Sequence, residues 1–143
     1  MPTPDFEEAI DRYHEAAADF IKGKPELYLA VFSHQDDTTI ANPFGPPARG
    51  WALAEETMRR ACKLWSEGEI LGFDRISTNV TSELAYVLEM ERFTGRMGGS
   101  AEAAPITLRV TSVLRPEDGT WKVVHRHADP IAAARSAESV IQT

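Results

Sequence analysis

The chain has 143 residues, of which 43% are hydrophobic and 26% charged, so it is long enough and apolar enough for one ordinary globular domain. Its net charge of -7, with no cluster of Lys and Arg, argues against binding to nucleic acid. The single cysteine, Cys62, excludes an internal disulfide framework, and no apolar run approaches the roughly 20 residues of a membrane helix.

Three helices are predicted in the first half of the chain. Apolar residues recur at helical spacing from residue 6 to 21, after Thr3 and Pro4, which suit the start of a helix. Gly23 and Pro25 separate this helix from a short second one that ends near Phe32. The pattern of apolar residues predicts a third helix over residues 51–66.

Strands are predicted for most of the remaining sequence. A short strand over residues 38–42 leads into a proline-rich loop over residues 43–50. The periodicity then changes towards two over residues 69–81 and 83–94, which predicts a hairpin.

A second hairpin is predicted at the end of the sheet. Its strands cover residues 106–114 and 120–128, and the turn between them contains Asp118 and Gly119. The tail over residues 131–143 is rich in Ala and Ser and is interpreted as a weak helix or a frayed end.

This order of elements predicts an α+β fold. We expect a single domain over residues 1–143, in which a curved, cone-shaped antiparallel sheet wraps around the three helices. Such a cone leaves a pocket between its helices and the concave face of its sheet.

Three stretches resemble the nuclear transport factor 2-like superfamily, which includes ketosteroid isomerase and the SnoaL-like cyclases. They are the segments over residues 36–45, 85–90 and 118–127. The resemblance implies the cystatin-like cone fold. Trp121 followed by His125 and His127 is also similar to the end of the calmodulin-dependent kinase association domain, a non-catalytic assembler of the same superfamily.

The resemblance to ketosteroid isomerase implies a conserved type of pocket with altered chemistry. Those enzymes hold an oxyanion with a tyrosine and a protonated aspartic acid, and a second aspartate is the base. Tyr13 matches the tyrosine, whereas Asn42 stands at the position of the base and Ser112 at that of the acid. Because an amide cannot abstract a proton, steroid isomerase activity is not expected.

The alternation of side chains predicts which residues face the helices. On the strand over residues 83–94, the more apolar set, Tyr86, Leu88 and Met90, is expected inward, and Glu89 and Glu91 outward. The inward set of the next strand is Leu108, Val110, Ser112 and Leu114. The resemblance points Val124, Arg126 and Ala128 inward and Trp121, Val123, His125 and His127 outward.

Seven residues are candidates for the pocket, and a purely structural role is the alternative for three of them. A buried Arg126 needs an anionic ligand or a carboxylate, and the alternative is a salt bridge to Glu89 or Glu91 at a sheet rim. Tyr13 is otherwise a core aromatic and Asn42 a turn residue. The complete set of pocket candidates is Tyr13, Asn42, Trp51, Tyr86, Met90, Ser112 and Arg126.

The remaining polar residues give weaker signals. His125 and His127 form an alternative polar pair that could ligate a metal together with Asp129, but two histidines alone predict a subunit interface better. His14 and His34 are expected to be solvated or at helix ends, and Cys62 to be structural. We expect neither a metal nor a cofactor.

Two functions remain open from the sequence. The first is a cytoplasmic module that binds a small, largely apolar ligand with an anionic or carbonyl group. The alternative is an isomerase, cyclase or hydratase acting on a small carbonyl compound, although no inward Asp, Glu or His is predicted to be its base. We further expect no membrane partner, and a homodimer through a convex sheet face carrying Val87, Phe93, Val113, Trp121 and Val123.

Overall fold

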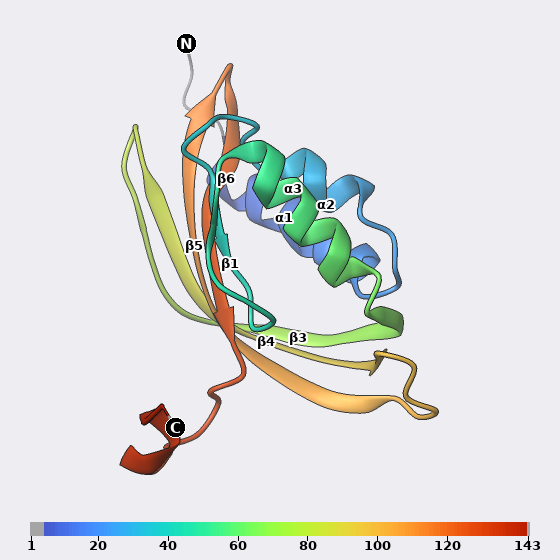
Figure 1. Ribbon diagram of the computed structural model, residues 1–143. Helices are drawn as coiled ribbons and strands as arrows, with labels where there is room; N and C mark the ends of the chain where they lie inside the picture. Colours follow the sequence, from blue (N-terminus) through green and yellow to red (C-terminus); the bar gives the residue numbers. More distant parts are fainter. Residues whose placement is uncertain (1–4, 143) are drawn as a thin grey trace.

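The computed structural model describes residues 5–142, in which a six-stranded sheet curves around three helices (Figure 1). The strands follow one another in the order β2, β1, β6, β5, β4, β3. All three helices lie on the concave face of the sheet, and this confirms the predicted α+β cone. The cavity described below lies between these two layers.

The three helices are α1 (Phe6–Phe20), α2 (Glu26–Val31) and α3 (Trp51–Cys62). The Asp5 carboxylate caps α1 by accepting a hydrogen bond from the backbone N–H of Glu8, while the predicted cap at Thr3 and Pro4 lies outside the described residues. Helix α3 is shorter than predicted because Trp65 already belongs to the sheet. The Trp65 ring packs edge-to-face on Phe93, with the ring centroids 5.2 Å apart.

The strands are β1 (Thr39–Ala41), β2 (Ala48–Arg49), β3 (Trp65–Val80), β4 (Ala85–Met97), β5 (Ala104–Glu117) and β6 (Thr120–Asp129). Strands β3 to β6 form an antiparallel meander, whereas β1 runs parallel to β6. Three register shifts between β3 and β4 accompany the bend of the sheet in Figure 1, since bulges increase the local twist. Strand β2 lies within the segment that was predicted to be wholly loop.

The predicted facing of β4 is wrong. Val87, Glu89, Glu91 and Phe93 are buried on the helix side, and Tyr86 points outward with 37% of its surface exposed. Leu88 and Met90 alternate with the buried set and share the outer face with Tyr86. Apolarity misled the prediction because both glutamates find polar partners inside the cone.

The facing of β6 is correct in its second half only. Arg126 and Ala128 are buried on the inside as expected, but a register shift opposite Val113 and Leu114 changes the alternation. Trp121 and Val123 are therefore also buried in the core. Of the five apolar residues expected on the convex face, Val113 alone is not buried. The prediction of an exposed apolar convex face, which was the reason given for a dimer, is thus wrong. The dimer itself stays a prediction.

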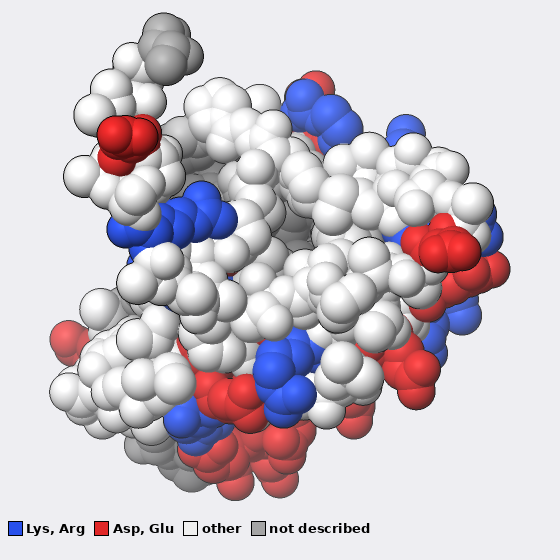
Figure 2. Space-filling model, turned by 90° about the horizontal axis from the view of Figure 1, so that it is seen from below, with Lys and Arg blue, Asp and Glu red and all other residues white. Residues whose placement is uncertain are grey.

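Charge is unevenly distributed over the molecule. On the face drawn in Figure 2, acidic side chains gather along one edge, and uncharged residues make up most of the surface.

After β6 the chain leaves the sheet, and its exposed tail contains one 3-10 turn, Ala137–Val140. No helix among the described residues is long and apolar enough to cross a membrane.

Candidate functional site

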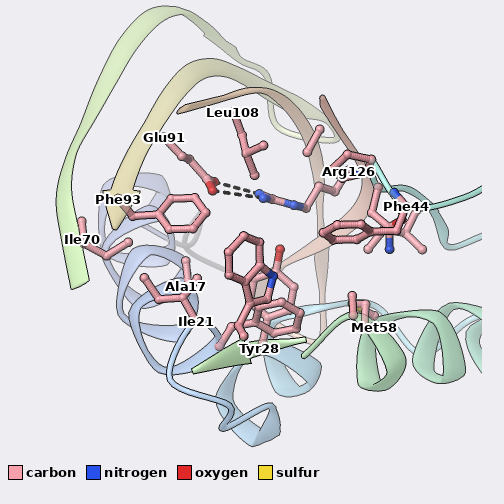
Figure 3. A pocket seen from close by; sticks show the side chains of 17 residues that line it. Ala17, Ile21, Tyr28, Phe44, Met58, Ile70, Glu91, Phe93, Leu108 and Arg126 are labelled. Carbon is pink, nitrogen blue, oxygen red and sulfur yellow. Dashed lines mark hydrogen bonds and ion pairs between the residues drawn. The ribbon is translucent and has the colours of Figure 1, made fainter. Parts of the chain in front are cut away.

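An apolar cavity of about 50 Å³ lies between the helices and the concave face of the sheet (Figure 3). This volume accommodates a few water-sized groups. In the view of Figure 3, Ile70 and Phe93 lie on one side of the cavity, and Phe44 and Met58 lie on the other. The further apolar lining comes from both layers and includes Phe20, Ile21, Tyr28, Ile40, Trp65 and Leu108.

The only charged side chains that line this cavity, among the described residues, are Glu91 and Arg126. They come from β4 and β6, and their side chains meet across β5, which lies between these strands. Arg126 Nη1 and Nη2 donate to the two Glu91 carboxylate oxygens at 2.8 and 3.1 Å. Both side chains are at least nine-tenths buried, so the pair is bidentate and shielded from solvent.

Two tyrosines complete the surroundings of the guanidinium. Its central carbon lies 5.8 Å from the ring centroid of Tyr13 and 5.7 Å from that of Tyr28. Burial lowers the pKa of Arg126, but the Glu91 carboxylate opposes this effect and the pKa is raised overall. Burial raises the pKa of both tyrosines. Arg126 is therefore charged and the tyrosines are neutral near neutral pH.

Hydrogen bonds fix the position of Arg126 from its far side. Nη1 also donates to the Tyr13 hydroxyl oxygen at 2.7 Å, and this hydroxyl lies 2.7 Å from Ser112 Oγ. Because Tyr13 accepts from a guanidinium, its own hydrogen is available for Ser112. Both residues are buried, but neither lines the cavity. Their hydrogen bonds orient Arg126 from outside the cavity.

Arg126 retains hydrogen-bonding capacity. A guanidinium has five N–H donors, and three of them bond to Glu91 and Tyr13. The Nε donor and one Nη2 donor have no hydrogen bond to a described residue. These two donors are available to a further hydrogen-bond acceptor.

A second polar pair, between the partly buried His14 and the buried Glu89, links α1 to β4. His14 Nε2 lies 2.8 Å from Glu89 Oε1, and the imidazole stacks on Phe73 at a centroid distance of 3.7 Å. Glu89 is 1% exposed, and its Oε2 has no hydrogen-bond partner among the described residues. The prediction of a solvated or helix-end His14 is wrong, and so is the prediction that no carboxylate faces inward.

The other sequence candidates are distributed around the molecule. Asn42 lines the cavity, and its Oδ1 accepts a hydrogen bond from the Phe44 backbone N–H at 3.0 Å, so it is both a turn residue and a wall residue. Trp51 stacks on His34, with the ring centroids 3.8 Å apart, and does not line the cavity. His34 is nevertheless exposed, three residues after the end of α2, and its Nε2 lies 2.9 Å from the Leu29 carbonyl oxygen, so the expectation of a solvated or helix-end residue is confirmed.

Four more candidates lie on the outer face of the sheet. They are Tyr86, whose hydroxyl lies 3.0 Å from Ser77 Oγ, Met90, and the pair His125 and His127. His125 Nδ1 lies 2.7 Å from Thr39 Oγ1, while His127 is exposed. The described residues contain no group of three or more His, Cys, Asp or Glu arranged to hold a metal ion.

Cys62 is buried on α3, and its Sγ lies 3.4 Å from the carbonyl oxygen of Phe20. Burial raises the pKa of its thiol to about 11, so the thiolate is scarce near neutral pH. This environment suits the structural role that was expected.

The residues that sequence reasoning missed are Glu91, Phe44 and Met58. For Glu91 a signal existed, because a buried arginine needs a carboxylate and β4 offers two of them. The pair was considered only at a sheet rim, and the structure places it inside. For Phe44 the apolar character of a proline-rich loop was the signal. For Met58 the helical stripe indicates burial but not a cavity.

Known proteins share both the sequence pattern and the fold of this chain. The sequence model of the SnoaL-like domain family matches residues 7–133. No match was found among curated protein sequences. Among solved structures, a nuclear transport factor 2-like superfamily protein from Salmonella enterica is similar with a TM-score of 0.74 and 24% identity, covering 92% of each chain.

Two further structures are similar at lower identity. A ketosteroid isomerase-like protein from Erwinia carotovora atroseptica has a TM-score of 0.72 and 17% identity, over 89% of this chain and 94% of its own. A proposed dehydratase of the nuclear transport factor 2-like family from Streptomyces avermitilis has a TM-score of 0.71 and 16% identity, over 89% of this chain and 97% of its own. At these identities the structures establish a shared fold.

Proposed function

Because the chain belongs to the SnoaL-like domain family, we propose that its cavity binds a small, largely apolar molecule whose carbonyl group lies beside Arg126. The observation that carries this proposal is a buried guanidinium on the cavity wall with two unused N–H donors. The rest of the lining is mainly aliphatic and aromatic, which favours an apolar ligand body.

The charge of the site favours a carbonyl over an anion. Glu91 already neutralises Arg126, so an anionic group would introduce an uncompensated charge into an apolar cavity. A neutral carbonyl oxygen accepts hydrogen bonds from the unused donors without that cost. Of the two ligand groups considered from the sequence, the carbonyl is the one we retain for the interior.

Steroid isomerase activity is not part of this proposal. Asn42 stands where the base of those enzymes would be, and its Oδ1 is engaged by the backbone of Phe44. Ser112 stands where their acid would be and bonds to Tyr13. An amide and a hydroxyl cannot perform the roles of the two carboxyl groups.

Calorimetric titration with acetone and 2-butanone, whose four and five non-hydrogen atoms suit the small cavity, tests the proposal. The site variant is the double substitution Arg126→Leu with Glu91→Leu, which removes both charges and the N–H donors together. Its matched control is Arg109→Leu with Asp129→Leu, an ion pair at 2.8 Å on the outer face of the same sheet. We expect ketone binding to be lost in the first variant and kept in the second. Equal binding by both variants would refute the proposal.

The second candidate function is an enzyme that abstracts a proton next to the carbonyl, as an isomerase, cyclase or hydratase could. The observation in its favour is the position of Glu91 on the cavity wall, since a carboxylate has lone pairs beyond the two that Arg126 occupies. Arg126 beside it would stabilise the developing oxyanion.

Exchange of the α-hydrogens of the ketone in D₂O, followed by proton NMR, separates the two functions. The enzyme candidate predicts faster exchange with the natural protein than with Glu91→Gln. If the ketone binds but its exchange is not accelerated, the chain is a binding module. Such a result would leave the first proposal intact and remove the second.

A further inference from the structure

Phe44 separates the inner cavity from a second hollow on the outside. A groove of about 460 Å³ runs between the proline-rich loop and α3. The groove and the inner cavity share three wall residues, Asn42, Phe44 and Ala61. In Figure 3 the Phe44 ring lies at the side of the cavity that Met58 also borders. The two spaces therefore adjoin at Phe44.

The loop holds the Phe44 backbone and leaves its side chain partly exposed. The hydrogen bond from the Phe44 N–H to Asn42 and the pairing of β1 with β2 fix the two ends of the loop. The prolines stiffen the segment between these strands. Phe44 is 43% exposed, and its one aromatic ring contact among the described residues, with Trp65, has a centroid distance of 6.2 Å. At the neighbouring Gly45, an added Cβ would meet no atom within 4 Å.

The residues that line the groove differ in charge from those that line the inner cavity. Apart from Asn42, Thr57 and Arg60 its described walls are apolar or small, and Leu53 is 47% exposed on it. Arg60 is the one charged residue of its described lining. Its nearest carboxylate, on Glu56, is 4.0 Å away and well exposed, so Arg60 remains accessible to an anion at the solvent edge of the groove.

We propose that Phe44 sets the length of the ligand, which is an elongated oxo-carboxylate. Rotation of the Phe44 ring joins the cavity to the groove. The carbonyl then lies beside Arg126, the hydrocarbon body passes Phe44, and the carboxylate lies at Arg60. This inference rests on the proposed binding of a carbonyl in the cavity, because it extends the same ligand outward. The charges agree, since the inner pair is neutral and the outer arginine is cationic at the rim.

Titration calorimetry with 2-butanone, 2-octanone and 7-oxooctanoate tests the length and charge of the ligand. The four added methylenes of 2-octanone should raise the affinity about tenfold over 2-butanone, less than full burial would give because the groove is open. Arg60→Gln should weaken 7-oxooctanoate about threefold and leave 2-octanone unchanged. Arg59→Gln is the matched control, because Arg59 pairs with Glu55 at 2.9 Å and does not line the groove.

Stopped-flow binding tests the role of Phe44. Phe44→Ala should raise the association rate constant of 2-octanone several-fold, and Leu53→Ala, which alters the groove but not the partition, should not raise it. Unchanged rates in Phe44→Ala would overturn the gating role. If ketones bind only when the Arg126–Glu91 pair is intact, equal affinities for 2-butanone, 2-octanone and 7-oxooctanoate would overturn the elongated ligand. If no ketone binds, or if ketones bind equally well without the Arg126–Glu91 pair, the proposed function itself is refuted.

Discussion

Arg126 on β6 and Glu91 on β4 form a buried, bidentate ion pair across the intervening strand β5, with N–O distances of 2.8 and 3.1 Å. This pair joins the fold to the candidate site. It satisfies two charges within the cone, and it also presents the guanidinium to the cavity.

Removal of one partner of the pair should be much more harmful than removal of both. Arg126→Leu leaves the Glu91 carboxylate buried without its counter-charge, and the expected loss of unfolding free energy is about 3–5 kcal/mol. Glu91→Leu should cost a similar amount. The double variant should lose much less than the sum of the two single losses, as measured by urea denaturation. Additive losses would contradict the coupling.

Tyr13 should contribute to stability through its hydroxyl group. Tyr13→Phe removes an acceptor for Arg126 and a partner of Ser112, and we expect a loss of about 1–3 kcal/mol by denaturant unfolding. Tyr86→Phe is the matched control, because its hydroxyl lies on the outer face beside Ser77. That variant should stay within about 0.5 kcal/mol of the natural protein. Equal effects of the two substitutions would contradict the buried network.

His14 should matter because of Glu89. In His14→Ala, neither oxygen of the buried Glu89 carboxylate retains a hydrogen-bond partner among the described residues, and we expect a loss of about 2–3 kcal/mol. Part of this loss also comes from the lost stacking on Phe73. His14→Gln keeps a donor and should recover part of the stability in thermal unfolding. If His14→Ala unfolds at the same temperature as the natural protein, the pair has no structural role.

His125 should make stability depend on pH. Burial first and the nearby His127 second lower the pKa of His125 in the folded protein. The unfolded chain therefore binds this proton more readily, so stability falls as the pH drops through the unfolded value of about 6.5. His125→Asn should flatten the melting temperature between about pH 7.5 and pH 5.5. A variant with an unchanged pH profile would contradict this assignment.

The fold could be predicted from the sequence because its signals are local and agree with one another. Periodicity places the three helices, and the turn at Asp118 and Gly119 places the final hairpin, where both residues have positive φ angles of 52° and 79°. The end of α3 could not be predicted, because Trp65 continues the helical stripe but packs on Phe93 in the sheet. Tertiary packing decided that boundary.

The candidate site was predictable only in part. Arg126, Asn42 and Tyr13 follow from the resemblance and from the cost of burying an unpaired arginine. The facing of β4 does not, because a glutamate on an alternating strand indicates an exposed face unless its partners are known. Those partners, His14 and Arg126, are 75 and 35 residues away in the sequence. The register shift in β6 is equally invisible in a pattern of period two.

The most direct test of the proposed carbonyl site is the carbon-13 chemical shift of 2-butanone labelled at its carbonyl carbon and bound to the protein. Hydrogen bonds from Arg126 polarise the carbonyl, so we predict a downfield shift relative to the free ketone. The Arg126→Leu, Glu91→Leu variant should abolish that shift, and the Arg109→Leu, Asp129→Leu control should keep it. A bound ketone whose carbonyl signal is unmoved, or is the same in all three proteins, would contradict the proposal.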